Sequence, residues 1–413
     1  MASVLTKVPP LTLDRPQRRV FWATFAGWGL DGFDYMLYTL AIGAVSIAFG
    51  LNHEQAGLIG TVTLLFSAFG GIVAGTLSDR FGRVRILAAA IFLYSLFTAL
   101  SGIASSFPEL LVYRAVEGLG FGGEWAVGAV LISEVIPAKK RGAVAGFVQG
   151  AWSFGWALAV IASVLILPNF GALGWRMMFW VGLLPAVAVI YILRKVPESP
   201  VWLAARRTRE AKAPISLGLI FRRKILRSTI LATLLSIGMQ SGYYAIFTWL
   251  PTYLSESRGL NAVGAAGYLV FVIAGSFLGY VAAGFANDRF GRKPTFAVFG
   301  VLSAVTVVVY AYARIPSGLV IYVGFPLGFF GSGIISGFGP FLAELFPSEM
   351  RGAGQGFCYN VGRGVAALAP AVVGALAGSY GLGTGISLFA ASAYGLFLIA
   401  LVFLPETRGR ELA

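Results

Sequence analysis

The sequence predicts an all-helical membrane protein with twelve transmembrane helices in two six-helix halves. Its composition, its long apolar segments and an internal repeat carry this prediction. Apolar residues make up 58% of the 413 residues and charged residues only 12%, whereas a soluble domain has about 25% charged residues. Twelve segments are long enough, at about 1.5 Å per residue, to cross a hydrocarbon core of about 30 Å. They cover about 20–49, 54–78, 84–105, 108–135, 141–167, 174–195, 227–255, 262–287, 293–314, 317–346, 352–378 and 383–404.

The positive charges gather on one side of the predicted membrane. Of the 31 Lys and Arg residues, 26 lie in the termini, the central segment and the loops on the side of the termini. Three, Arg176, Arg258 and Arg314, lie on the other side. The positive-inside rule therefore predicts that both termini are cytoplasmic. This topology explains the net charge of +14 without a nucleic-acid partner. We expect a monomer in the lipid bilayer of a plasma membrane, as in a bacterial inner membrane.

Three motifs recur in the second half of the chain at a nearly constant offset. The loop 75–83 returns at 284–292, and the segment 134–142 returns at 344–352, offsets of 209 and 210 positions. Pro197-Glu198 returns as Pro405-Glu406. A duplicated six-helix unit places its substrate between the halves, near the membrane midplane. We expect a cytoplasmic segment over 1–19, an N-terminal bundle over 20–196, a basic cytoplasmic linker over 197–226, a C-terminal bundle over 227–404 and a cytoplasmic tail over 405–413.

These motifs resemble a known family. The loop 75–83, its copy, and the segment Arg114–Gly122 resemble the signature motifs of the major facilitator superfamily. The segments 30–34, 122–125 and 356–362 resemble its proton-coupled organic-acid symporters, which include sialic acid, aromatic acid and monocarboxylate branches. The segments 197–203 and 405–409 also resemble the sugar porters. The resemblance implies the major facilitator fold and uptake of an organic anion with a proton by alternating access. The alternatives are a proton symporter for a sugar or polyol, and a proton antiporter for drugs or metabolites.

Acidic residues inside the predicted spans are the candidate proton carriers. A charged side chain at the membrane centre costs about 2.5–3.5 kcal/mol on insertion scales. Asp31 and Asp34 share one helix face, as do Arg114 and Glu117. Residue counting places Asp34 level with Arg114, so we expect this ion pair, with Glu117 sharing it. Asp31 falls level with Glu117 and is the first candidate for the proton, followed by Glu117 or Glu124. The alternative is that these groups form only a buried structural network.

Arg363 is the one charged residue of the second half that is predicted to lie near the membrane midplane, and we expect it to bind the substrate. A guanidinium presents a fork of donors that matches a carboxylate at two points. In a competing role, Arg363 would pair with an acid of the first half and act as a gate. Amide and aromatic side chains at mid-span positions are further candidates for the substrate pathway. They are Trp28, Tyr35, Tyr38, Gln149, Trp152, Gln240, Tyr243, Tyr244 and Asn360.

The charged residues of the repeated loops are expected to act in conformational change rather than in substrate binding. Carboxylates beside helix N-termini and arginines of neighbouring loops would hold one face closed in one state of the cycle. The set comprises Asp79, Arg80, Arg83, Glu134, Arg141, Asp288, Arg289, Arg292, Glu344 and Arg351. Neither a metal site nor a cofactor is expected. The single His53, predicted to be a solvated loop residue, and the single Cys358 offer no nucleophile and base for an enzyme.

Overall fold

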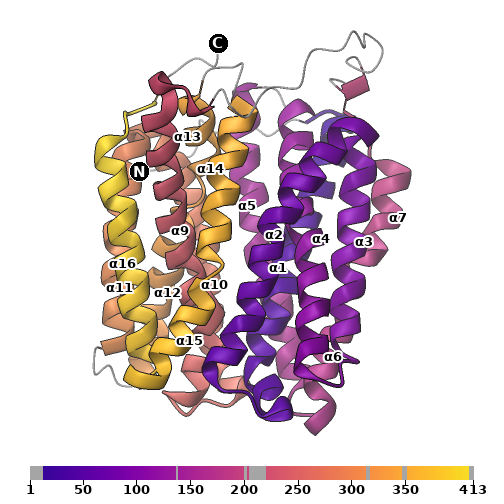
Figure 1. The fold of residues 1–413 in the computed structure, drawn as a ribbon, viewed down its shortest axis with the longest axis vertical. Coiled ribbons are helices and arrows are strands. Elements are labelled where there is room, and N and C mark those ends of the chain that lie inside the picture. Colours follow the sequence, from indigo (N-terminus) through magenta and orange to yellow (C-terminus); the bar gives the residue numbers. More distant parts are fainter. Residues whose placement is uncertain are drawn as a thin grey trace, which may run out of the picture.

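The computed structural model describes residues 13–135, 138–199, 202–203, 220–312, 317–346 and 351–408. Within these ranges, 12 segments are long and apolar enough to cross a membrane, and they form the bundle of Figure 1. The first half contains α1 (Arg15–Phe49), α2 (His53–Phe81), α3 (Arg83–Ser101), α4 (Phe107–Val135), α5 (Ala138–Ile166), the short η2 (Gly171–Leu173), α6 (Gly174–Val181) and α7 (Ala186–Lys195). The second half contains α9 (Arg223–Glu256), α10 (Ala262–Phe290), α11 (Arg292–Tyr312), α12 (Ser317–Gly333), α13 (Phe338–Leu345), α14 (Arg351–Ala366), α15 (Ala369–Tyr380) and α16 (Leu382–Phe403).

Local sequence signals set where the long helices begin. Asp14 caps α1 by accepting a hydrogen bond from the backbone N–H of Gln17 at 2.8 Å. Asn52 caps α2 through the N–H of Gln55 in the same way. These side chains satisfy N–H groups that have no partner within the helix. The helix starts therefore agree with the predicted spans to within a few residues.

Three of the predicted spans are interrupted. Span 6 consists of α6 and α7, span 10 of α12 and α13, and span 11 of α14 and α15. Pro185 stands at the start of α7 and Pro370 within the first turn of α15, where a missing N–H costs little. Irregular backbone is tolerated at membrane depth where protein covers it or where it lines a cavity. The break between α12 and α13 meets this condition, because its Ile335 lines the central cavity described below.

Glycines let neighbouring helices approach closely. A Cβ atom at Gly118 or Gly122 of α4 would overlap the α2 backbone at Thr63 or Ser67. Gly328 of α12 approaches the α10 backbone in the same way, 210 positions after Gly118. Small residues at such crossings permit dense packing between membrane helices.

The two halves pack along several helix pairs. The first half, from indigo to magenta, stands beside the second half, from rose-red to yellow, in Figure 1. Across this boundary α5 packs on α10, α2 packs on α14 and α15, and α1 packs on α9. Since the number of crossings is even, α1 begins on the same face of the molecule on which α16 ends. We call this the terminal face and the other the distal face.

Candidate functional site

Four carboxyl groups and one guanidinium lie buried between α1 and α4. Asp31 and Glu124 are within hydrogen-bonding reach of each other, and so are Asp34 and Glu117. Arg114 Nη2 lies 3.4 Å from Glu117 Oε2. None of these five residues is more than 2% exposed. The acids thus form two carboxyl pairs, of which only the Asp34–Glu117 pair has an arginine beside it in ion-pair contact.

The pairing differs from the predicted one. The ion pair of Arg114 within the described residues is with Glu117, not with Asp34. Arg114 and Glu117 lie one turn apart on α4, so the contact forms within a single helix. Asp34 lies within hydrogen-bonding reach of Glu117 and interacts electrostatically with Arg114. Likewise, Asp31 lies against Glu124 rather than level with Glu117.

Arg114 is enclosed by aromatic rings on the distal side of the acids. Its guanidinium carbon lies 5.3 Å from the ring centre of Tyr38 and 5.8 Å from that of Phe179. Its carbonyl accepts a hydrogen bond from Thr63 Oγ1 at 3.3 Å. Arg114 therefore connects α1, α2 and α6 to α4, and it does not line the central cavity.

Arg363 on α14 is also fully buried, but it has no ion-pair partner among the described residues. Its Nη2 donates to Tyr359 Oη at 3.5 Å, while its Nε and Nη1 have no hydrogen-bond partner. Arg363 interacts electrostatically with the carboxyl groups of Asp31 and Glu124. Donors left without partners in a buried site favour binding of an anion, because an unmatched buried charge is costly.

Arg363 lies at a small cavity between the two halves. The cavity measures about 30 Å³, which is room for a water molecule or two. Seven of its lining residues are aromatic. The lining consists of Trp28, Phe121, Trp152, Met239, Gln240, Tyr243, Tyr244, Tyr280, Ile335, Tyr359 and Arg363. A binding site for a small organic molecule usually measures about 300–1,000 Å³, so the halves must separate before a substrate fits.

The structure places five of the nine mid-span candidates at this cavity. They are Trp28, Trp152, Gln240, Tyr243 and Tyr244. Gln240 Nε2 donates to the Tyr359 carbonyl at 3.0 Å, which leaves Gln240 Oε1 free to accept. The other four lie elsewhere. Tyr35 forms a hydrogen bond with the other half, and Tyr38 packs on Arg114. Asn360 donates to Gly356 of its own helix, and Gln149 is half-buried on α5 outside the cavity lining.

Four aromatic residues of the site were not among the predicted binding residues. Phe121 and Tyr359 line the cavity, and their rings lie 5.6 Å and 5.2 Å from the Arg363 guanidinium carbon. Trp125 lies at 5.6 Å from the same atom. A signal was available in the sequence, because Phe121 and Trp125 are one turn apart on α4 and flank Glu124. Tyr280, a further lining residue, lies in an apolar run that carries no such signal.

Polar contacts between the halves lie on the distal side of the cavity. Tyr35 Oη and Thr248 Oγ1 are 2.7 Å apart, and the N–H of Ala371 donates to Thr61 Oγ1 at 3.2 Å. His53 Nε2 lies 2.9 Å from Glu256 Oε2, and the two side chains are 39% and 48% exposed. His53 is therefore the first residue of α2 and joins the halves, rather than a solvated loop residue. Together these contacts join the two halves on the distal side of the cavity.

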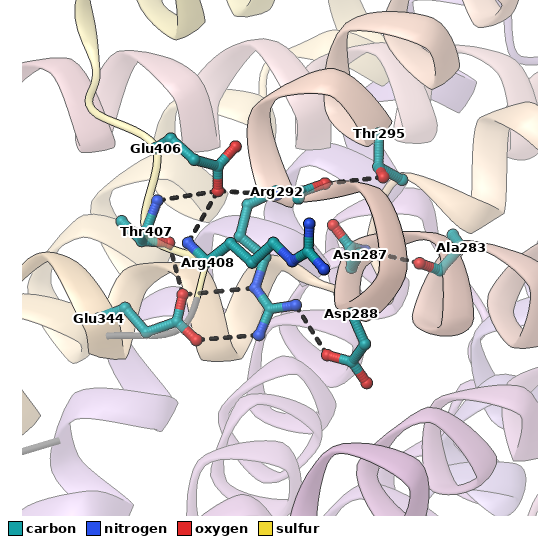
Figure 2. A network of polar contacts seen from close by, with 10 residues as sticks. Ala283, Asn287, Asp288, Arg292, Thr295, Glu344, Glu406, Thr407 and Arg408 are labelled. Carbon is teal, nitrogen blue, oxygen red and sulfur yellow. Dashed lines mark hydrogen bonds and ion pairs between the residues drawn. The ribbon is translucent and has the colours of Figure 1, made fainter. Parts of the chain in front are cut away.

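On the terminal face, charged residues form a network within the second half (Figure 2). Arg292 donates to Asp288 Oδ1 at 2.8 Å and to Glu344 Oε1 at 3.0 Å. Glu406 accepts the N–H groups of Arg292 and Lys293, each at 2.9 Å, and so caps α11. Thr407 Oγ1 also contacts Glu344. These contacts brace one half rather than joining the two.

The first half repeats this arrangement. Glu198 accepts the N–H groups of Arg83 at 3.0 Å and Val84 at 3.2 Å and so caps α3. Gly82 and Gly291 precede the capped helices with φ of 103° and 107°, a conformation that favours glycine. Two other predicted gating residues, Arg80 and Arg289, are exposed. Their guanidinium groups lie over the rings of the following residues, Phe81 and Phe290. The side chains of Asp79, Glu134, Arg141 and Arg351 lie outside the described part of the structure.

The sequence is similar to transporters over almost its whole length. The model of the Major Facilitator Superfamily matches residues 24–283, and that of sugar (and other) transporters matches residues 206–413. A probable 4-methylmuconolactone transporter of Cupriavidus pinatubonensis is 41% identical, with 95% of this chain and 91% of the relative covered. A cis,cis-muconate transport protein of Acinetobacter baylyi is 32% identical, with 94% of both chains covered.

The fold is that of a solved carrier. The crystal structure of a D-xylose–proton symporter matches with a TM-score of 0.76 at 23% identity, over 95% of this chain and 99% of that one. The chain therefore belongs to the major facilitator superfamily. It is a multi-pass membrane transporter and not an enzyme.

Proposed function

We propose that this carrier takes up an organic acid anion together with a proton, with Arg363 binding the carboxylate. The observation that carries the proposal is the pair of buried Arg363 nitrogens without partners at the central cavity. The charge of Arg363 also acts on the buried Asp31 and Glu124 of the other half. The transport roles of the two muconate-type relatives support an organic acid as the substrate. By the distribution of positive charge, the terminal face is cytoplasmic, in a bacterial inner membrane.

Charge balance gives a reason for the coupling of anion and proton. Without substrate, the Arg363 charge stabilises the negative form of the Asp31–Glu124 pair. A carboxylate that binds Arg363 neutralises this charge, so the acid pair then binds a proton more readily. By linkage, a protonated acid pair raises the affinity for the anion by the same factor. Anion and proton would therefore bind and leave together.

Transport in right-side-out membrane vesicles tests the proposal. We expect labelled benzoate to accumulate above its external concentration only when the outside is more acidic than the inside. Arg363→Ala should abolish uptake, whereas Arg258→Ala, which removes an arginine of the distal face, should retain it. Uptake of benzoate that is independent of Arg363, or accumulation driven by the opposite gradient, would contradict the proposal. The second result would instead indicate an antiporter.

A sugar or polyol porter is the second candidate, because the second half of the chain matches the sugar transporter model. A polyol needs many neutral hydrogen-bonding groups. Among the cavity-lining residues, the buried polar side-chain atoms without partners are the indole N–H groups of Trp28 and Trp152, Gln240 Oε1, Tyr243 Oη and the two Arg363 nitrogens. Four of these groups are neutral, which is few for a polyol, and the other two belong to a charged guanidinium. We therefore expect xylose not to be taken up and not to compete with benzoate in the same vesicles.

A further inference from the structure

Two rings of the site form a stacked pair across the boundary between the halves. The ring of Trp125 on α4 lies 4.0 Å from the ring of Tyr359 on α14, with 10° between their planes. Aromatic pairs usually adopt offset or edge-to-face geometries with centroids about 4.5–7 Å apart. This pair is thus unusually close and face to face, and its two members come from different halves of the carrier.

Arg363 lies beside both rings. Its guanidinium carbon is 5.6 Å from the Trp125 ring centre and 5.2 Å from the Tyr359 ring centre. A cation at such a distance is attracted to the faces of aromatic rings. A carboxylate bound to the free Arg363 nitrogens would therefore hold the rest of its molecule next to the two rings.

Separation of the halves at this level breaks the stack, because each half contributes one ring. Each ring then loses its partner and presents a face to the widening cavity. A planar conjugated group restores the lost stacking on one or both faces, whereas a puckered ring or a branched chain does not. The remaining walls are mostly aromatic as well.

We propose that Trp125 and Tyr359 form a ring clamp that selects planar, conjugated carboxylates, with Arg363 binding the carboxylate. This inference rests on the proposed function and narrows its substrate class. A planar acid replaces the partner ring in the clamp when the halves separate. Carboxylates of equal size that are not planar meet the same guanidinium but find no matching surface.

Benzoate and cyclohexanecarboxylate test the clamp, because they have the same carbon skeleton size and charge but only benzoate is planar. We would measure the affinity of the purified full chain for each by titration calorimetry. Ring stacking contributes about 0.5–1.5 kcal/mol, so we expect wild type to prefer benzoate by about fivefold. Trp125→Leu and Tyr359→Leu should reduce this preference to less than about twofold, mainly by weakening benzoate binding.

Three controls separate the possible failures. Trp125→Phe keeps an aromatic face and should retain the preference, and Trp22→Leu removes an outward-facing Trp that is 56% exposed and should leave both affinities unchanged. Equal affinity of wild type for both acids, or an equal loss of both in Trp125→Leu, would refute the clamp while leaving carboxylate binding intact. If wild type bound neither acid, or if Arg363→Ala bound both as wild type does, the proposed function itself would be wrong. Variants are compared only after their unfolding temperatures match that of wild type.

Discussion

At the residue scale, the central chemistry lies in the arrangement of three charged groups. Asp31 and Glu124 touch in the interior, and two carboxylates in contact disfavour a second negative charge. Arg363 is positive at every physiological pH, and its charge acts on both acids from the other half. Arg363 has no ion-pair partner among the described residues, so it can interact with the carboxyl pair in one state and with a substrate carboxylate in another.

We predict that Arg363→Lys will keep the charge and lose most of the transport. A lysine ammonium is a point charge and lacks the planar fork that meets a carboxylate at two points. Losing one charge-assisted hydrogen bond costs about 1.5–3 kcal/mol, so the half-saturation concentration for benzoate uptake should rise about tenfold or more. An unchanged value in vesicle uptake would show that the fork does not bind the substrate.

We predict that Asp31→Asn will uncouple transport from the proton gradient. The amide cannot take up a proton, so accumulation against a gradient should stop, while exchange of internal for external benzoate should continue. Asp34→Asn belongs to the other carboxyl pair and should retain gradient-driven accumulation. Normal accumulation by Asp31→Asn, measured with an acidic exterior, would rule out Asp31 as the proton carrier.

At the element scale, the two halves use the same device to begin corresponding helices. Glu198 caps α3 and Glu406 caps α11, each through two backbone N–H groups. Partial burial opposes ionisation of Glu406, but four backbone donors outweigh it and hold the pKa of Glu406 below its usual range. A carboxyl group with a lowered pKa stabilises the folded state at pH values above the pKa that it has in the unfolded chain, about 4.3. This contribution to stability is lost as the pH falls through the pKa of Glu406 in the folded state.

We predict that Glu406→Gln will lower the unfolding free energy by about 0.5–1 kcal/mol at pH 7. This is the lower part of the range for helix caps, because most of Glu406 is exposed despite its partial burial. The difference from wild type should shrink below about pH 4, where the carboxylate of the wild type is also lost. Thermal unfolding in detergent at several pH values measures both effects. A difference that persisted unchanged at low pH would mean that the charge of Glu406 does not stabilise α11.

The twelve spans and the repeat were predictable, because membrane helices must be long and apolar and a duplication leaves a constant offset. The partners of the buried acids were not. Counting at 1.5 Å per residue assumes straight, upright helices, whereas α1 has 35 residues and exceeds the roughly 20 needed to cross the core. A long helix can tilt or project beyond the core, and this shifts its register against α4 by more than one turn. Asp31 therefore meets Glu124 instead of falling level with Glu117.

The ring pair was unpredictable for a different reason. Trp125 and Tyr359 are 234 positions apart and belong to different halves. Neither position shows a periodicity that distinguishes it from the many other aromatic residues of the chain. Contacts between elements depend on how the halves pack, and this information is spread over the whole interface rather than written in a local pattern.

At the scale of the whole molecule, the described polar contacts between the halves gather on the distal side. Tyr35–Thr248, Ala371–Thr61 and His53–Glu256 all lie on that side of the cavity. Opening to the distal side must break them, and a hydrogen bond contributes about 0.5–1.5 kcal/mol. Their removal should therefore shift the carrier toward the state that is open to the distal side.

We predict that Tyr35→Phe will increase distal opening several-fold. A cysteine at Gly60 would face Pro370 and Thr248 across the boundary, so a maleimide reaches it only after the halves separate. The assay uses Gly60→Cys with Cys358→Ser, which leaves one cysteine in the chain. Tyr113→Phe is the matched control, because its hydroxyl bonds only Glu109 of the same helix. Equal labelling rates with and without Tyr35→Phe would show that this bond does not hold the face closed.

The tightness of the central cavity has a mechanical consequence. Since about 30 Å³ admits no more than a water molecule or two, loading of any organic acid must dilate the protein. Release of water from the substrate carboxylate adds to this expansion. Hydrostatic pressure, which favours the smaller of two states, should therefore weaken substrate binding and drive the carrier back to its compact form.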